Sequence, residues 1–214
     1  AYPRKELHTI PTKVSASEFP TKREDFLDNW QASVPAFMTG ERISPAAKGT
    51  ALHLFLQFAE YNLAKENLEE QLQSLCEKRF LTKEQANAVD LSKLKMFFAS
   101  DLIKRILSAE QYFREYRFTV DLKASDIEGD IKEGSNELVV LQGAIDCVFI
   151  EDGQIVIVDY KTDCLKSIEK LQFRYQKQLS LYRYAAQKCL GLPVKECLIY
   201  SFSLGQTVSI NFLL

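Results

Sequence analysis

Hydrophobic residues recur at helical spacing in the first half of the chain, beginning at Pro45. Between Ala46 and Tyr61 the apolar positions include 51, 52, 54, 55, 58 and 59, the pattern of a helix with one buried face. The same spacing predicts further helices at about 65–79, 83–89 and 91–108. Thr82 and Gln85 have the spacing of a capping box at the start of the helix expected at 83–89. We therefore expect residues 45–108 to form a helical block.

From Tyr112 onward the hydrophobic period changes to two, which is typical of strands. We expect five strands, at about 112–122, 137–150, 154–161, 195–204 and 207–213. A long helix is expected from Ser167 to Leu190, because Ser167 is a suitable N-cap and Gly191 a suitable stop. The last two strands are expected to turn at Gly205-Gln206. The second half of the chain thus reads β-β-β-α-β-β.

The first 45 residues show no sustained hydrophobic period. They are rich in Pro, Ser and Thr, and four of the six prolines of the chain precede Pro45. This composition predicts an extended connector with one short helix at about 22–31. The chain begins at Ala1 and still has a strand-like pattern at Leu214, so we expect it to be a piece of a longer protein.

Composition excludes several classes of protein. Hydrophobic residues make up 46% of the 214 positions, which excludes a disordered chain. The formal net charge of −2 excludes a uniformly basic nucleic-acid binder, and no apolar run approaches the length of a membrane span. The five cysteines form no CxxC pair, so we expect buried, reduced thiols and not metal ligands.

Charge is segregated along the chain although the total is balanced. Asp121 to Asp159 carries ten acidic residues and two lysines, whereas Lys161 to Lys195 carries eight basic residues and two acidic ones. An acidic hairpin beside a basic helix is suited to a cation site next to a polyanion site. The alternative is that these charges only solvate a loop and a helix face.

The hairpin around Asp152-Gly153 carries the most specific chemical signal. If these two residues form a type I′ turn, Asp146 lies opposite Asp159, with Cβ atoms about 4.5–5.5 Å apart. Lys161 would project from the same face as Asp159, since side chains alternate along a strand. Two carboxylates in strands this apolar need a cation, either Lys161 with a divalent ion or Lys161 alone in a buried ion pair.

Three segments together resemble a known family. They are Gly49-Thr-Ala-Leu-His53, Leu141-Gln-Gly-Ala-Ile-Asp146 with Asp159-Tyr-Lys-Thr-Asp163, and Tyr175-x-x-Gln178-x-x-x-Tyr182. In this order they resemble the RecB-family branch of the PD-(D/E)XK nucleases, and most of all the nuclease domain of AddA-type helicase–nuclease subunits. The resemblance implies an α/β (α+β) fold. Its restriction-endonuclease-like core has a mixed central sheet with flanking helices, here preceded by the helical block.

The resemblance also implies roles for single residues. His53, Asp146, Asp159 and the Tyr160 carbonyl would hold Mg²⁺, with Mn²⁺ as an alternative. Lys161 would be the catalytic lysine beside Asp146 and Asp159, in an enzyme that hydrolyses DNA phosphodiesters. Glu115 is similar to an acidic position of the family and is expected only to support the site.

Residues of the long helix would support the site and contact single-stranded DNA. Gln178 and Tyr182 match the last family motif, and either Tyr175 or Tyr182 is expected to stack on unpaired bases. Phosphate contacts are expected from the basic residues Lys166, Lys170, Arg174 and Lys177.

The resemblance extends to partners and organisation. No cysteine precedes Cys76, so the cysteine pattern of cluster-containing relatives is lacking and no iron–sulfur cluster is expected, which favours the AddA-type branch. Residues 1–44 would tether the nuclease domain, 45–214, to helicase domains of the same polypeptide. The helical block would be 45–108 and the αβ core 109–214. An AddB-type partner subunit and a bacterial cytoplasmic location in association with DNA are implied, with no membrane.

Two other functions are consistent with parts of this pattern. A nuclease-like domain without catalysis would bind only DNA or a partner. Such a domain usually lacks a metal ligand or the catalytic lysine, whereas His53, Asp146, Asp159 and Lys161 are all present here. A restriction-type endonuclease would recognise its own target sequence, whereas the Pro- and Ser-rich lead-in favours a tether. We therefore expect an exonuclease acting on single-stranded DNA ends in double-strand break repair.

Overall fold

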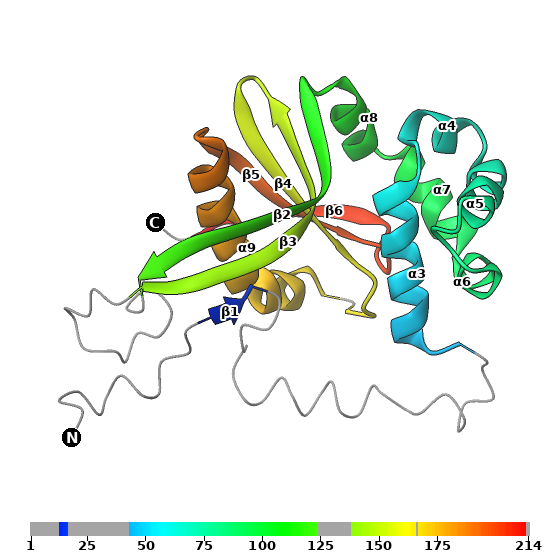
Figure 1. Ribbon diagram of the computed structural model, residues 1–214, viewed down its shortest axis with the longest axis horizontal. Coiled ribbons are helices and arrows are strands. Elements are labelled where there is room, and N and C mark those ends of the chain that lie inside the picture. The colour runs from blue at the N-terminus through cyan, green and yellow to red at the C-terminus, as the bar shows by residue number, and fades with distance from the viewer. Residues whose placement is uncertain (1–12, 17–42, 124–137, 166, 213–214) are drawn as a thin grey trace.

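The computed structural model describes residues 13–16, 43–123, 138–165 and 167–212. In these ranges a six-stranded mixed sheet lies between two helical layers, with the helices of residues 45–108 on one face and the long helix of residues 168–190 on the other (Figure 1). The expected α/β fold with a mixed central sheet and flanking helices is confirmed. None of the described helices is long and apolar enough to cross a membrane.

The helical block consists of six helices. They are α3 (Pro45–Phe58), α4 (Tyr61–Glu66), α5 (Leu68–Glu77), α6 (Lys83–Ala88), α7 (Leu91–Ala99) and α8 (Asp101–Ser108). Both halves of the expected capping box at Thr82 and Gln85 are present. The single helix expected over 91–108 is wrong, because Ser100 is extended and its hydroxyl accepts a hydrogen bond from the Ile103 N–H, which starts a new helix.

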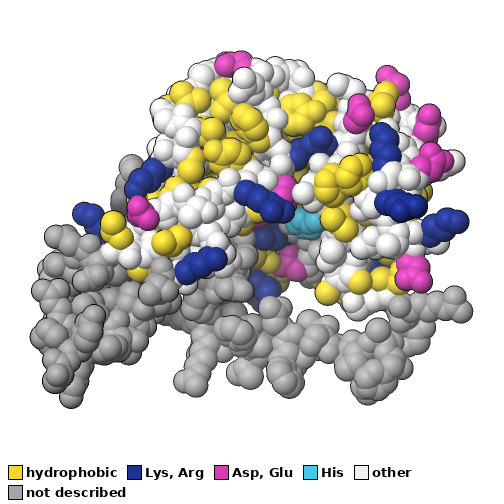
Figure 2. All heavy atoms as spheres, viewed as in Figure 1, with side chains coloured by type: hydrophobic (Ala, Val, Ile, Leu, Met, Phe, Trp, Pro, Cys, Tyr) yellow, Lys and Arg dark blue, Asp and Glu magenta, His cyan; other side chains and the backbone are white. Residues whose placement is uncertain are grey.

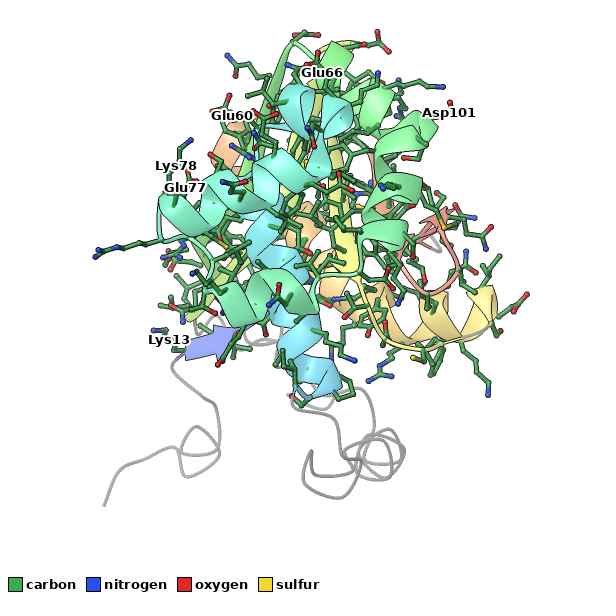
Figure 3. The ribbon with its side chains drawn as sticks, turned by 90° about the vertical axis from the view of Figure 1, so that its right-hand side faces the viewer. Lys13, Glu60, Glu66, Glu77, Lys78 and Asp101 are labelled. Atoms are coloured by element: carbon green, nitrogen blue, oxygen red, sulfur yellow. The ribbon has the colours of Figure 1, made fainter. Side chains whose placement is uncertain are left out.

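Apolar side chains of the block face the sheet and charged ones face outward. Phe55, Phe97 and Ile103 are fully buried in one core with Phe149 and Tyr200 of the sheet. On the opposite side the charged residues are exposed, and Figure 3 shows several of them at the outer edge of the block, among them Glu66, Glu77, Lys78 and Asp101. This amphipathic division explains why the helical spacing is readable from the sequence.

The strands are β1 (Lys13–Ser15), β2 (Gln111–Lys123), β3 (Leu138–Glu151), β4 (Gln154–Lys161), β5 (Val194–Ser201) and β6 (Gln206–Ser209). Their order in the sheet is β1-β3-β4-β5-β6, and β2 pairs with β3. Helix α9 (Ile168–Leu190) starts after Ser167 and stops at Gly191, whose φ of 69° is the left-handed conformation that the stop requires.

Two parts of the chain differ from expectation, and the outcome for a third is not described. The lead-in is more than a connector, since β1 pairs in parallel with residues 140–142 of β3 and Ala16 is buried. The last strand ends at Ser209, and the turn before it spans residues 202–205 because Ser201 pairs with Gln206. The short helix expected at 22–31 lies outside the described residues.

The β3–β4 hairpin has the expected register. Glu151 pairs with Gln154, and Asp152 and Gly153 have φ values of 54° and 68°, the two positive values of a type I′ turn. Pairing extends as far as Cys147 with Val158. Beyond this point β3 has β1 as its neighbour, and β4 continues beside β5, so the two strands separate. The separation begins at Asp146 and Asp159, and we call this place the fork.

Candidate active site

The candidate site lies at the fork, where β3 and β4 separate. Asp146 and Asp159 follow the last ladder pair, Cys147 with Val158, and do not themselves pair in the hydrogen-bonded ladder. Instead, the Asp146 carboxylate takes the place of the missing strand partner, because its Oδ2 accepts a hydrogen bond of 2.7 Å from the Tyr160 N–H. A backbone donor left buried without a partner would be costly. The fork therefore fixes the Asp146 side chain against β4.

Helix α3 brings His53 to Asp146 from the other side. His53 Nδ1 and Asp146 Oδ1 are 3.2 Å apart. The helix lies close to the end of β4, since a Cβ atom on Gly49 would be 2.8 Å from Thr162 Oγ1. At its other end, the Arg114 guanidinium donates a hydrogen bond to the carbonyl of Ala59, which caps the helix. Contacts at both ends thus hold His53 in place.

Electrostatics couples His53 and Asp146. Burial lowers the pKa of His53, but the hydrogen bond to Asp146 and its charge outweigh burial, and the pKa is raised. Burial raises the pKa of Asp146, whereas the hydrogen bond and charge of His53 lower it below the ordinary value. The His53 side chain is 37% exposed and that of Asp146 16%, so the site opens to solvent at the imidazole. Figure 2 shows the histidine at the surface with acidic and basic side chains beside it.

Lys161 forms a second ion pair in the same place. Its Nζ lies 2.7 Å from Asp159 Oδ2, donates to Gln178 Oε1 at 3.2 Å and lies 4.2 Å from the centre of the Tyr175 ring. The Asp159 side chain is only 3% exposed. Burial raises the pKa of Asp159 to about 6, although the charge of Lys161 opposes this. The carboxylate is therefore held where its charge is costly, which is common at functional sites.

The chemistry of these side chains fits a divalent cation. Asp159 Oδ2 is buried and lies 2.7 Å from the Lys161 ammonium, and the negative charge of Asp146 also acts on this carboxylate. Two carboxylates and an imidazole meet at the fork, and carboxylate oxygens are the preferred ligands of Mg²⁺. As they stand, the described residues hold no group of three His, Cys, Asp or Glu side chains that could bind an ion.

Helix α9 supports the lysine through a chain of side chains. Gln178 Nε2 donates to the Tyr182 hydroxyl at 2.8 Å, which orients the amide so that its oxygen faces Lys161. The Tyr175 hydroxyl donates to Asp163 Oδ2 at 2.7 Å, so the ring is fixed beside the ammonium. Tyr182 is only 3% exposed, and the expectation that it stacks on an unpaired base does not hold for its buried ring.

The basic residues of α9 have different surroundings. Lys170 and Lys177 are exposed. Arg174 lies 3.8 Å from Asp163 Oδ2 and 5.6 Å from the Tyr175 ring centre, so it borders the site. Lys166 lies outside the described residues.

Glu115 lies closer to the site than its sequence signal indicates. It falls between the paired residues Arg114 with Cys147 and Tyr116 with Ile145, at the level of Asp146, and its φ is 52°. A residue with this φ that is not glycine is strained and is often functional. The charge of Glu115 also raises the pKa of Tyr182, after the larger effects of burial and Asp159. Glu115 therefore belongs to the surroundings of the fork.

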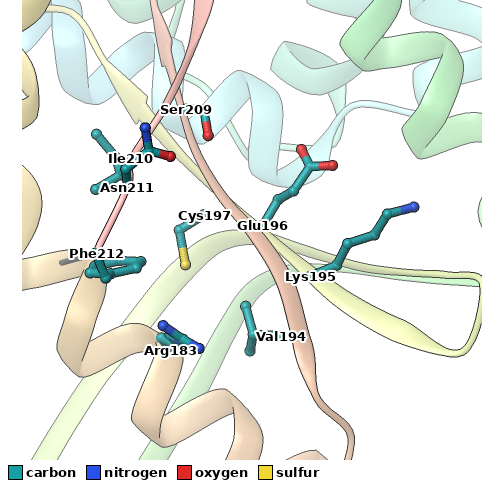
Figure 4. A pocket seen from close by; sticks show the side chains of 9 residues that line it. All are labelled: Arg183, Val194, Lys195, Glu196, Cys197, Ser209, Ile210, Asn211 and Phe212. Atoms are coloured by element: carbon teal, nitrogen blue, oxygen red, sulfur yellow. The ribbon is translucent and has the colours of Figure 1, made fainter. Parts of the chain in front are cut away.

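A pocket of about 490 Å³ lies elsewhere, between α9 and the edge formed by β5 and β6 (Figure 4). Arg183, Cys197 and Phe212 are among the residues that line it. None of the predicted site residues does, so the pocket does not belong to the fork.

Comparison with known proteins places the chain in a family. Residues 23–205 match the model of the PD-(D/E)XK nuclease superfamily. The chain is 33% identical over 219 residues to the A-type subunit of an ATP-dependent helicase/nuclease from Clostridium botulinum strain 657, covering 95% of the chain and 17% of that protein. It is 34% identical over 223 residues to the corresponding protein of Syntrophomonas wolfei, covering 98% of the chain and 18% of that protein.

The chain therefore spans less than a fifth of these relatives. A solved structure, that of SSO0001, superposes with a TM-score of 0.37 and 11% identity over 77% of this chain and 67% of that one, which is too distant to support an inference. The three motifs and the forked sheet agree with the match to the family model over 23–205, and the chain belongs to the PD-(D/E)XK nuclease superfamily.

Proposed function

We propose that this chain is a DNA nuclease that requires Mg²⁺ and shortens single-stranded ends. The observation that carries this proposal is the convergence of His53, Asp146 and the Asp159–Lys161 pair at the fork. A merely structural ion pair would need neither the second carboxylate nor the imidazole. The family membership supports nuclease chemistry, and the divalent ion and the single-stranded substrate are the finer parts of the proposal.

Four groups would hold the cation: the side chains of His53, Asp146 and Asp159, and the Tyr160 carbonyl. The Tyr160 side chain is buried and its hydroxyl lies 3.3 Å from the Tyr61 hydroxyl, so only its backbone is available. When bound, a divalent ion offsets negative charge on the phosphate and lowers the pKa of a water molecule. Mn²⁺ is the alternative metal that could occupy the same four groups.

The chain's own residues orient the reactants. The Lys161 ammonium, held by Gln178 and the Tyr175 ring, offsets the negative charge that develops on the phosphate and orients the attacking water. The water oxygen forms a bond to phosphorus while one phosphorus–oxygen ester bond breaks. The departing sugar oxygen takes up a proton, which leaves one phosphate end and one hydroxyl end.

The names of the relatives support a setting for this activity. Their names describe one subunit of an ATP-dependent helicase/nuclease, and this chain matches only a small part of them. We propose that residues 45–214 are the nuclease module, joined through 1–44 to helicase domains of the same polypeptide and working with an AddB-type partner in double-strand break repair. The complex would act on DNA in the bacterial cytoplasm, and this chain would carry no iron–sulfur cluster.

A cleavage assay on the 214-residue chain tests the proposal. An end-labelled single-stranded oligonucleotide should be shortened with Mg²⁺ and stay intact with EDTA, and a double-stranded copy should be cut more slowly. Asp152→Asn is a matched control, since Asp152 is an exposed acid at the hairpin turn and Asn also accepts its positive φ. The control should cut at the unmodified rate. Binding of the strand without any Mg²⁺-dependent cleavage would contradict the proposal and favour a domain that only binds.

A further inference from the structure

Phe173 is the most exposed large hydrophobic side chain among the described residues, at 68%. It lies in the second turn of α9, in the segment where that helix carries its basic residues. Core packing does not explain it, because the buried residues of the helix include Leu171, Leu179 and Tyr182 but not Phe173. A single exposed hydrophobic side chain is ordinary on a protein surface, so the neighbours of Phe173 decide whether it can bind a ligand.

The surroundings of Phe173 favour a polyanion with aromatic bases. Lys170 and Lys177 are three residues before it and four residues after it, so all three side chains share one exposed face of the helix. Glu169, four residues before Phe173, is the acid on this face, and its carboxylate accepts a hydrogen bond from Ser167 Oγ. A ring between two lysines is the combination that binds single strands, since lysines contact phosphates and the ring stacks on a base.

Phe173 is one residue from Arg174, which borders the candidate site. The next residue, Arg174, lies 5.6 Å from the Tyr175 ring centre, and the Tyr175 ring lies 4.2 Å from Lys161 Nζ. Phe173 thus lies on the far side of α9 from Tyr175 and Gln178, which face Lys161, and a strand would pass around the helix, whose diameter with side chains is about 10 Å. A strand of a few nucleotides spans this distance.

We propose that Phe173 is a stacking platform for a base of single-stranded DNA a few nucleotides from the bond that is cut, with Lys170 and Lys177 on the flanking phosphates. This inference rests on the proposed single-strand nuclease function and assigns its entry surface. Stacking tolerates any base, so the surface adds affinity without adding sequence preference.

The test separates stacking from charge with two probes. Binding of oligodeoxythymidine and of an abasic oligomer of equal length is measured in EDTA, so that no cleavage occurs. Phe173→Ala should weaken binding of oligodeoxythymidine by roughly 5- to 150-fold, the range for loss of one stacked base, and leave binding of the abasic oligomer unchanged. Phe173→Trp should retain affinity, whereas Phe173→Leu should behave like alanine. Phe80→Ala is the control and should bind both oligomers like the unmodified chain, because Phe80 is a 43% exposed aromatic residue that lies in the helical block and not on α9.

Other outcomes overturn the inference. If Phe173→Ala binds both probes like the unmodified chain, Phe173 does not stack on DNA and a protein surface becomes the better occupant, while the nuclease proposal stands. If the substitution weakens binding of both probes equally, the ring does not act by stacking on a base. If the unmodified chain binds neither probe, the inference fails together with the single-stranded substrate on which it rests.

Discussion

Gly49 of α3 and Thr162 after β4 approach so closely that a Cβ atom on residue 49 would lie 2.8 Å from Thr162 Oγ1. His53 is one helical turn further along α3 and contacts Asp146 at 3.2 Å. The small size of Gly49 therefore determines how near the imidazole comes to the carboxylate. Residue 49 needs glycine for its small size and not for its freedom to adopt a positive φ, since it lies within helix α3.

Gly49→Ala should reduce cleavage by about 10- to 100-fold, because a small displacement of α3 moves His53 away from Asp146. The free energy of unfolding should change little, since alanine favours a helix by about 1 kcal/mol over glycine and offsets the tight contact. The measurement is the cleavage rate together with urea unfolding of the same variant.

The partner substitution provides the control for Gly49→Ala. Thr162→Ala removes the Oγ1 atom that the new methyl group would meet, so the double variant should cut at the rate of Thr162→Ala alone. If Gly49→Ala cuts at the unmodified rate, the close approach does not position His53.

Gln178→Met should lower kcat by about 10- to 150-fold and leave the KM for single-stranded DNA nearly unchanged. The reason is that Lys161 loses the oxygen that accepts its hydrogen bond, and such bonds to charged groups contribute about 1.5–3 kcal/mol. Tyr182→Phe should have a smaller effect, about fivefold, since it removes only the hydroxyl that orients the amide. Steady-state kinetics on both variants would refute this order if Tyr182→Phe were the more damaging change.

The ion-pair network between the helical block and the hairpin should make stability depend on pH. Arg105 of α8 binds Glu151 through two hydrogen bonds of 2.7 and 3.0 Å and also contacts Glu196. The hydrogen bond from Arg105, followed by that from Lys195, lowers the pKa of Glu151 to about 2. Because this is below the ordinary value of 4.5, the stabilisation is present above about pH 4.5 and is lost as the pH falls toward 2.

Glu151→Gln should accordingly lower the free energy of unfolding by about 1 kcal/mol at pH 7, a small value because the side chains are partly exposed to solvent. The difference in the free energy of unfolding between this variant and the unmodified chain should be smaller at pH 4 than at pH 7, and smaller again at pH 3. Urea unfolding at the three pH values measures it, and an equal difference at all three would show that the charge of Glu151 is not the cause.

Charge reversal on the outer face of α9 should weaken binding of single-stranded DNA. Lys170→Glu with Lys177→Glu should flatten the dependence of log affinity on log salt by about 0.7 per lost phosphate contact. Lys65→Glu, an exposed lysine in the helical block, is the control and should leave the slope unchanged. If both variants and the unmodified chain show equal slopes of log affinity against log salt, the lysines on the outer face of α9 contact only solvent and not DNA.

Much of the hairpin could be predicted from sequence because local chemistry determines it. Asp152-Gly153 favours a type I′ turn, and that turn sets the register of five pairs from Glu151 with Gln154 to Cys147 with Val158. The helical block is equally readable from its amphipathic spacing, apart from the break at Ser100.

The fork itself could not be predicted, because it depends on distant segments. β3 exchanges β4 for β1 as its neighbour, and β1 comes from a lead-in whose composition predicts only a connector. The strained backbone of Glu115 and the exposure of Phe173 likewise arise from packing between elements. The only sequence signals are an acid within an alternating strand and an aromatic residue within a basic helix.

The most direct test of the site is Asp159→Asn, measured for cleavage and for binding in parallel. The substitution keeps the shape of the side chain and removes the buried carboxylate that pairs with Lys161, while the lysines on the outer face of α9 stay in place. Cleavage with Mg²⁺ should fall by about 100-fold or more, since the ion would supply both the activated water and charge stabilisation. Affinity for single-stranded DNA in EDTA should persist. An Asp159→Asn chain that cuts at the unmodified rate would contradict the assignment of the active site to the fork.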